Sequence, residues 1–439
     1  MPISLAFGVL EIAVALWPRR YDGHFTSTGE DFRLLTWPKL VRFPIFWIGL
    51  LLIGLIVTQA LNWRWLFELE RGKWWIELRP YKEWLPTSVK VPFHIGGPWP
   101  VATVFTTAWL LVCAAWIGFT RRRTLQILLA VVVTGGFVLG LVGLVQRLSG
   151  SGKMLWLWEI NYASFFASFI YKNHAGAYLN LTLAACVALA AWFMIRKAVR
   201  HERSSPAPVF VFIAIVISIS VLFTYSRGAL ALTLVFLGLA TVGGLFLFLR
   251  QPSATRRLPV VLAIAILFAG FAALGLRTRP AKVAWERLQT LSDQGNEGFQ
   301  TREAARNTTL AMFQEFWPRG AGAGCFQFHF REYQKTRPEL GPTSGRGAVR
   351  WQHAHCDLLQ FPLELGLAGT ALLASMLGYW LVRFARSGAW RNPVSLSLLA
   401  GCGLLLAHAW LDLIFQSPAI LLLWCLYWPV MIRWAETDK

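Results

Sequence analysis

A chain of 439 residues that is 56% apolar and only 15% charged is too hydrophobic for a soluble globular protein. The mean hydropathy of +0.50 and the repeated apolar runs near twenty residues instead predict an all-α, polytopic membrane protein. Helices are expected because lipid offers the backbone no hydrogen-bond partners. The net charge of +20 does not indicate a nucleic-acid partner, because the basic residues form short clusters between the apolar runs.

The apolar runs predict about 11–12 transmembrane helices, because eleven runs are visible and the first is short. Basic residues cluster in short connectors between these runs, and all of these clusters fall on one side of the membrane in this scheme. The positive-inside preference makes that side cytoplasmic. The candidate spans are residues 3–17, 44–61, 101–119, 124–146, 175–195, 208–225, 228–249, 258–276, 357–382, 394–411 and 418–433.

The outer side receives the Trp-rich loop 62–100, the segment 148–174 and a large polar insert. We therefore divide the chain into N-terminal transmembrane helices at 1–276, a large outer loop at 277–356 and C-terminal transmembrane helices at 357–439. The tryptophans of the first loop fit either a belt at the membrane interface or a surface on which sugars stack.

The large outer loop is expected to be partly helical. Thr301 is a plausible N-cap for a helix that starts at Arg302 and runs to Trp317, where Pro318 stops it. The glycines of segment 320–324 then form a flexible turn, at which the backbone could approach a ligand closely.

Arginines in the outer segments are the first candidates for chemistry. Arg227, in the tight connection Tyr225–Gly228, violates the positive-inside preference, although an arginine at a helix end can also simply snorkel to the interface. Arg302 and Arg306 lie four apart and share one helical face, which could also be an ordinary solvated basic face. Across 277–352, twelve basic residues oppose seven acidic ones, an excess of five that favours an anionic partner. Guanidinium groups suit phosphate in particular.

A second candidate group is His353, His355, Cys356 and Asp357. These residue types could hold zinc, but no second set of ligands at typical spacing lies nearby, so we expect no metal. A histidine near the mouth of a helix is better suited to accept or give a proton near neutral pH. A hydrogen-bonded interfacial histidine is the plainer alternative.

Two further signals lie near the outer ends of spans. Lys172 and Asn173 precede the span that starts near Gly176 and place another cation on the outer side. His408 and Asp412 lie four apart, so in a helix they project to one side. Ionisable groups at such depth are functional candidates, although an aspartate can also serve only to pair with a neighbour.

Several of these stretches resemble the bacterial O-antigen ligase and O-antigen polymerase superfamily of membrane glycosyltransferases, over roughly residues 160–420. They are YKNHAGAYLNL, SRGAL at 226–230, the Arg302 helix running into FWPRGAGAGCF, and above all HCDLLQFPLELGLAG. The last stretch resembles the histidine-led signature of the family, and its place after the large outer loop also fits. One departure is Cys356, because the family often has Asn after the motif histidine.

The resemblance implies a GT-C-like fold and a metal-independent, inverting transfer of a glycan from a polyprenyl-diphosphate carrier to an acceptor hydroxyl. It places this reaction at the periplasmic face of the bacterial inner membrane. Carried over by position, His355 would be the general base or a partner of the acceptor, and Arg302 and Arg227 would hold the diphosphate. Arg306 matches the family less closely. The remaining candidates for substrate binding are Lys172, Asn173 and Asp412.

The expected partners are therefore the lipid-linked glycan donor, a glycan or lipid acceptor and the bilayer, with no cofactor. Ligation to lipid A–core, polymerisation of repeat units and transfer to protein all remain open. A transporter of an anionic lipid or glycan is an alternative of another class, although the spans hold few charges and show no inverted repeat. A purely structural scaffold would leave the clustering of Arg227, Arg302 and His355 unexplained.

Overall fold

The computed structural model describes residues 37–70, 73–160, 165–249, 297–335, 337, 340 and 351–437. Within these ranges, eight helices are long and apolar enough to cross a membrane, and one further apolar helix is shorter. The chain is an all-α polytopic membrane protein, as its composition predicts. The helices are α3 (Pro44–Leu61), α4 (Pro98–Gly118), α5 (Arg122–Leu148), α6 (Lys172–Arg200), α7 (Ala207–Phe223), α8 (Arg227–Leu249), α13 (Asp357–Ser387), α14 (Pro393–Leu411) and α15 (Pro418–Glu436).

Each of these nine helices coincides, within a few residues at either end, with one predicted span. The other two predicted spans, 3–17 and 258–276, lie outside the described residues. The described chain forms two compact units. Unit 1 comprises the described residues of Met1–Gly118 and Gly295–Arg383, and unit 2 those of Phe119–Gln294 and Phe384–Lys439. The division at 1–276, 277–356 and 357–439 concerns membrane topology rather than compactness, and it stays a prediction.

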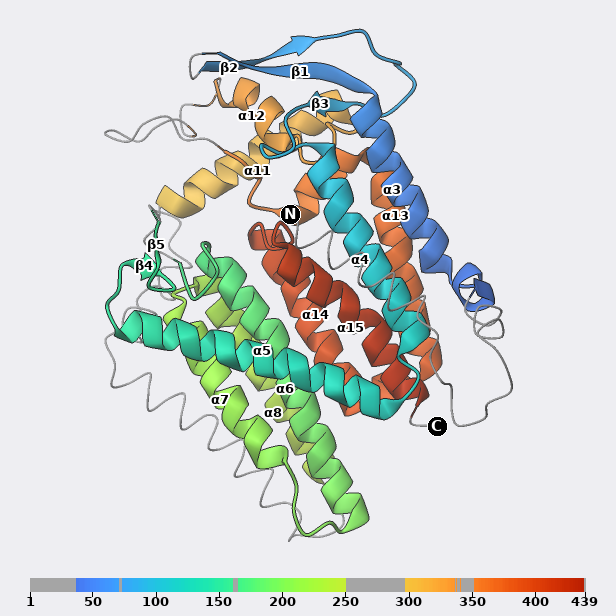
Figure 1. Ribbon diagram of the computed structural model, residues 1–439, viewed down its shortest axis with the longest axis vertical. Helices are drawn as coiled ribbons and strands as arrows, with labels where there is room; N and C mark the ends of the chain where they lie inside the picture. Colours follow the sequence, from blue (N-terminus) through green and yellow to red (C-terminus); the bar gives the residue numbers. More distant parts are fainter. Residues whose placement is uncertain are drawn as a thin grey trace. The chain divides into compact units, whose positions relative to one another are not determined.

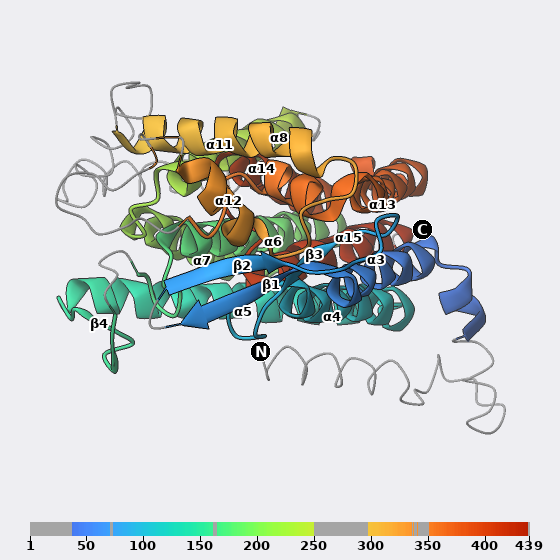
Figure 2. The same ribbon diagram turned by 90° about the horizontal axis from the view of Figure 1, so that it is seen from above.

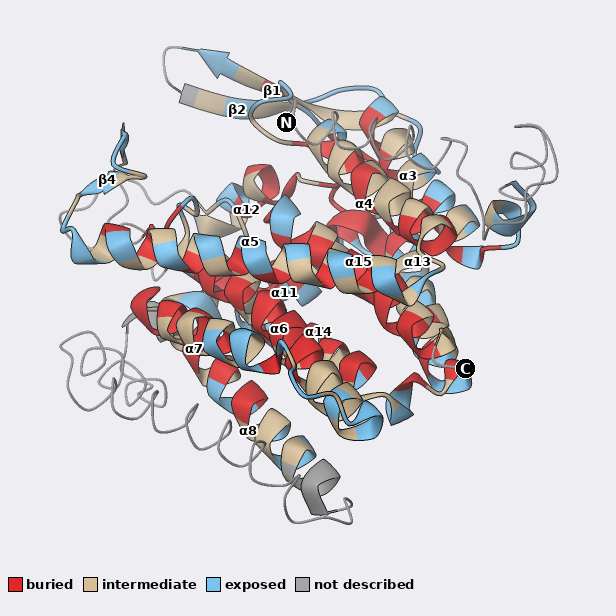
Figure 3. Cartoon of the chain, turned by 60° about the horizontal axis from the view of Figure 1, so that its bottom comes forward, coloured by how far each residue is buried: buried red, intermediate tan, exposed pale blue. Residues whose placement is uncertain are grey.

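Unit 2 is organised around α6, which packs against α5, α7, α8 and α14 (Figure 1). Small residues allow this close approach: a Cβ on Gly176 would lie 2.4 Å from the Cβ of Ala229, and one on Gly401 would lie 2.6 Å from that of Ala184. Helices in lipid associate through such small-residue contacts because burial against lipid tails supplies no driving force between them. Figure 3 shows the result, with α6 buried along much of its length and α5 alternately exposed.

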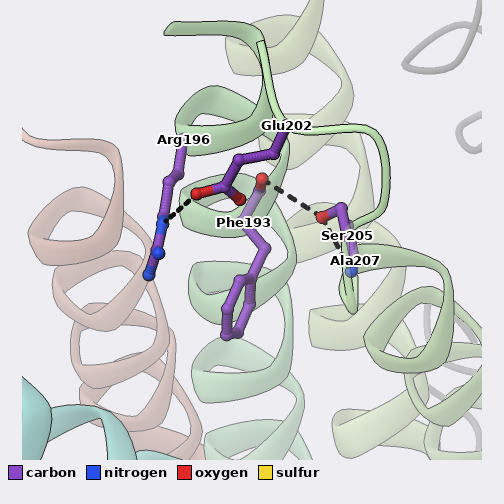
Figure 4. A network of polar contacts seen from close by, with 5 residues as sticks. All are labelled: Phe193, Arg196, Glu202, Ser205 and Ala207. Atoms are coloured by element: carbon purple, nitrogen blue, oxygen red, sulfur yellow. Dashed lines mark hydrogen bonds and ion pairs between the residues drawn. The ribbon is translucent and has the colours of Figure 1, made fainter. Parts of the chain in front are cut away.

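The end of unit 2 that is predicted to be cytoplasmic is closed by a short connector. His201 ends α6 in the left-handed region, with φ of 54°. Glu202 then turns back to pair with Arg196 at 3.0 Å, and the Ser205 hydroxyl donates to the Phe193 carbonyl at 3.3 Å (Figure 4). The same hydroxyl accepts from the backbone N–H of Ala207 at 3.2 Å, so this connector is fixed from both helices.

Unit 1 contains a small sheet that the sequence reading did not predict. Strands β1 (Trp63–Glu70) and β2 (Lys73–Leu78) form an antiparallel hairpin, and β3 (Ser88–Lys90) pairs with β1 in parallel (Figure 2). Phe67 of β1 and Val89 of β3 are buried with Phe328 of the large outer loop in one apolar cluster. Part of the predicted Trp-rich loop is therefore a sheet that packs on the outer loop.

The large outer loop is partly helical, with α11 (Glu297–Phe316) and α12 (Phe326–Gln334). Helix α11 ends just before Trp317–Pro318, as predicted, and this peptide bond is cis. The predicted N-cap is wrong, because Thr301 lies inside α11 rather than at its start. One apolar cluster holds α11 and α12 together with the start of α13. Its buried members are Ala305, Met312, Phe316, Ala321, Phe326, Phe330, Leu340, Ala354 and Leu363.

Helix α13 is broken at Gly366, which has φ of 67° and ψ of −167°. The backbone groups freed by this break bond to the glycine turn 320–324 instead. Ala321 N–H donates to the Leu363 carbonyl at 2.8 Å, and Gly322 N–H donates to the Glu364 carbonyl at 3.0 Å. Irregular backbone within a membrane helix is tolerated only where protein or water satisfies it, and here the outer loop does so. The glycine turn thus closely approaches protein backbone, not open space for a ligand.

Candidate functional site

The histidine turn, residues 353–356, lies in unit 1 immediately before α13. His355 has φ of 51°, in the left-handed region that few non-glycine residues adopt. Its half-buried ring meets the ring of Trp351 edge to face, with centroids 5.5 Å apart. Cys356 starts α13 by accepting from the backbone N–H groups of Leu359 and Gln360, at 3.2 and 3.0 Å. The imidazole is therefore presented at a helix start, as the sequence predicts.

The side chain of Gln360 holds the histidine turn from the helix side. Its Oε1 accepts from the backbone N–H of Ala354 at 3.0 Å, and its Nε2 lies 3.2 Å from Nδ1 of His353. The same Nε2 donates to Oε1 of Glu364 at 3.0 Å. Sequence reasoning did not single out Gln360 or Glu364. One signal in the sequence could have found them: an amide and an acid four residues apart inside an apolar span, which predicts that their side chains interact.

Arg306 belongs to the surroundings of the same turn. Ala305, next to it in α11, is buried in one cluster with Ala354 of the histidine turn. Burial raises the pKa of the Cys356 thiol, and the nearby Arg306 guanidinium opposes that rise because it favours the thiolate. Arg302 lies four residues earlier on α11 and is exposed. Unit 1 thus brings Arg306 close to the turn that carries His355, with Arg302 one helical turn away along α11.

A second polar group lies in unit 2, where α6 begins and α14 ends. The Tyr171 hydroxyl lies 3.0 and 2.8 Å from the two carboxylate oxygens of Asp412, and Asn173 Nδ2 donates both to that hydroxyl, at 2.8 Å, and to the carboxylate. Asn173 and Asp412 are both buried. Lys172 is the first residue of α6 and lies beside this group in the chain. Two of the predicted substrate-binding residues, Asn173 and Asp412, are therefore in direct contact.

The prediction that His408 and Asp412 project to one side of a helix is wrong. Helix α14 ends at Leu411, and Asp412 is extended, with φ of −159° and ψ of 178°. The carboxylate is thereby turned to Tyr171 and Asn173. A helical spacing rule fails here because the second residue lies just past the helix end.

Arg227 is the first residue of α8, after a three-residue connection from α7. Tyr225 turns the chain with φ of 56°, and the Ser226 hydroxyl accepts from the backbone N–H of Ala229 at 3.2 Å, which caps α8. A further arginine, which the sequence reading missed, lies nearby. The guanidinium of Arg147 is 5.4 Å from the Tyr225 ring and donates to the Phe165 carbonyl at 2.7 Å. Like Arg227, it is a basic residue at a span end predicted to face outward.

The residue types of the histidine turn could also belong to a metal site. Within the ranges that the structure describes, no three His, Cys, Asp or Glu side chains gather closely enough to hold a metal ion. Nδ1 of His353 lies 3.2 Å from the Gln360 amide, and Cys356 is buried.

Residues 211–374 match the family model Wzy_C, described as O-antigen ligase. The matched stretch contains Arg227, Arg302, Arg306 and His355, whereas Lys172, Asn173 and Asp412 fall outside it. No curated protein matches the chain. The family match confirms the resemblance of this stretch to the O-antigen ligase and polymerase superfamily.

Proposed function

We propose that this chain, a multi-pass member of the O-antigen ligase and polymerase superfamily, transfers a glycan from a polyprenyl-diphosphate carrier to an acceptor hydroxyl. The observation that carries the proposal is the histidine turn, which α13 and Gln360 hold rigidly beside Arg306 of α11. A histidine in a turn that has a permanent positive charge nearby suits the transfer of a sugar away from a diphosphate.

His355 acts in this proposal as the general base for the acceptor hydroxyl. Histidine is the side chain that most often serves as a general base, and the half-buried ring of His355 leaves one part open to an acceptor. A positioned general base contributes on the order of 10²–10⁴-fold to a transfer rate. Trp351 limits how the imidazole turns, because its ring lies against one edge of it.

Arg302 and Arg306 of unit 1 bind the diphosphate in this proposal, and Arg227 of unit 2 stays a predicted diphosphate-binding residue. Lipid diphosphate is already a good leaving group, so the protein mainly has to supply fixed positive charge where negative charge develops. Guanidinium groups do this without a metal, since their planar forks bond to two phosphate oxygens at once. Lys172, Asn173 and Asp412 of unit 2 stay predicted substrate-binding residues.

The reaction takes place on the periplasmic face of the inner membrane. The basic connector at 196–203 carries Arg196, Lys197, Arg200 and Arg203, which the positive-inside preference assigns to the cytoplasm. Helices α6 and α7 then place Lys172 and Tyr225 at the opposite ends from this connector. The candidate residues of unit 2 are accordingly assigned to the outer side.

The purified protein in proteoliposomes, given a labelled lipid-diphosphate glycan and an acceptor, tests the proposal. We expect label to move to the acceptor, and His355→Ala to abolish this movement. The matched control is His94→Ala, because His94 is an exposed histidine in the outer segment of unit 1. Movement of intact donor across the membrane without bond formation would show a transporter instead. Growth of a ladder of repeat units on the lipid carrier would show a polymerase.

A further inference from the structure

We propose that Gln360 and Glu364 are positioning residues for His355: together they fix the histidine turn in the geometry that presents its imidazole. This inference rests on the proposed role of His355 as the base. Both residues lie on α13, four apart and on one face, and both are almost completely buried, with exposed fractions of 1% and 3%. Neither is expected to touch substrate.

Glu364 is surrounded by donors. Its Oε2 accepts from the backbone N–H of Gly324 at 2.9 Å, and its Oε1 accepts from that of Phe326 at 3.1 Å and from Gln360 Nε2 at 3.0 Å. An ionised carboxylate only accepts hydrogen bonds, so all three contacts are complementary to it. The side chain therefore links the glycine turn and the start of α12 to α13.

This carboxylate also decides which way the Gln360 amide points. In its ionised form Glu364 can only accept, so the amide turns its Nε2 toward Glu364 and leaves its Oε1 on the other side. That Oε1 is the atom that accepts from the Ala354 N–H, one residue before His355. With the amide reversed, an N–H₂ group would face the Ala354 N–H and the bond would be lost. Glu364 thus sets, through one amide, the hydrogen bond that holds the histidine turn.

The turn needs such a bond because its conformation is not one that the chain adopts readily. His355 lies in the left-handed region, which costs non-glycine residues energy unless the surroundings impose it. The hydrogen bond to Ala354 is immediately next to this residue. Catalytic geometry is sensitive at this scale, since a misplacement of about 1 Å can cost on the order of 10²-fold in rate.

Gln59 of α3 provides a matched control. Its side chain is also buried, and it bonds to both α13 and the glycine turn, as Glu364 does. Its Nε2 donates to the Glu364 carbonyl at 3.0 Å, and its Oε1 accepts from the Ala323 N–H at 3.1 Å. It differs from Gln360 in having no bond to the histidine turn. Loss of Gln59 therefore removes a buried amide and two hydrogen bonds from the same network but leaves the Ala354 bond in place.

The test compares Gln360→Met, Glu364→Gln and Gln59→Met in the full-length protein in proteoliposomes, with kcat, donor KM and the unfolding temperature measured for each. We expect Gln360→Met and Glu364→Gln to lower kcat on the order of 10²-fold while KM changes by no more than about threefold. Glu364→Gln is the second, independent variant, since the amide that it introduces would place a donor against a donor. We expect Gln59→Met to lower the unfolding temperature while keeping kcat within about threefold of wild type.

Wild-type kcat in folded Gln360→Met would overturn the inference. So would an equal loss of kcat in Gln59→Met, because a purely structural role of the network would then suffice. Failure of the proposed function looks different: the wild-type protein itself would form no product, or His355→Ala would stay active. If Gln360→Met does not fold, Glu364→Gln with normal kcat overturns the inference by itself.

Discussion

Gly320 of the outer loop and Gly366 of α13 lie against each other so closely that neither has room for a side chain. A Cβ on Gly320 would lie 2.7 Å from the Gly366 nitrogen and 2.5 Å from the Glu364 oxygen. A Cβ on Gly366 would lie 2.4 Å from the Pro318 oxygen. Both residues also have positive φ, of 90° and 67°. At this contact the outer loop packs against the break in α13. A side chain at either glycine would therefore push the two segments apart.

Gly320→Ala is expected to destabilise the protein strongly. The left-handed conformation alone costs about 1–2 kcal/mol for a residue with a Cβ, and the clash is with backbone atoms that cannot move aside. A loss of several kcal/mol, on the order of 3–5, is expected in total. Thermal unfolding in detergent micelles measures it. The control is Gly378→Ala in α13, where a Cβ meets nothing within 4 Å. Equal unfolding temperatures for the two variants would contradict the role of the contact.

His329 is expected to make the stability of the protein depend on acid pH. Its ring lies between Trp65 and Phe316, at centroid distances of 4.5 and 4.6 Å, and its Nε2 has no hydrogen-bond partner among the described residues. Burial lowers its pKa to about 3; a hydrogen bond with the Ala321 backbone opposes this shift, while the charge of Arg64 adds to it. In the unfolded chain its pKa is near the ordinary value of about 6.5.

The sign follows from these two pKa values. Between about pH 6.5 and 3, the unfolded chain binds a proton that the folded protein does not, so stability falls as the pH is lowered, by up to about 1.4 kcal/mol per pH unit. Above pH 6.5 neither state binds it, and the contribution is constant. His329→Phe removes this titration. We expect the unfolding temperature of the variant to decline less than that of wild type between pH 6.5 and 4. Parallel declines would mean that His329 is protonated in the folded protein.

Arg302→Lys is expected to lower transfer by about 10- to 100-fold, because an ammonium group cannot replace a planar fork that bonds to two phosphate oxygens. The lysine keeps the charge, so the loss reports geometry rather than electrostatics. Initial rates with the labelled donor measure it. Arg319→Lys, another exposed arginine of the same loop, is the control and is expected to be active. Full activity of Arg302→Lys would remove Arg302 from the proposed site.

Chelation is expected to leave transfer unchanged. Guanidinium groups supply the positive charge in the proposed reaction, so excess EDTA should not change the initial rate. The same assay after dialysis, with and without added Zn²⁺ or Mg²⁺, completes the test. Loss of activity on chelation and its return with one metal would instead favour a metal role for the residues near His355.

Much of the described fold follows from hydrophobic pattern, since all nine described apolar helices match predicted spans. The sheet could not be predicted in this way, because the Trp and Arg residues at 63–66 suggested a membrane interface rather than the alternating pattern of a β-strand. The break at Gly366 and the bonds of Gln360 were also missed. The break depends on contacts with a segment about 40 residues earlier, and the bonds of Gln360 depend on a turn with positive φ at His355. Local hydrophobic pattern encodes neither feature. Resemblance, rather than periodicity, singled out His355.

The bonds between the glycine turn and the broken helix have a consequence for protein engineering. Since Leu363 and Glu364 carbonyls obtain their donors from Ala321 and Gly322, neither segment carries its own complete set of partners. A chimera that exchanges only the outer loop with a relative, or only this helix, would leave orphaned polar atoms at bilayer depth. Domain swaps in this protein should therefore cut before Glu297 and after Arg383, so that the glycine turn and α13 are exchanged as one segment.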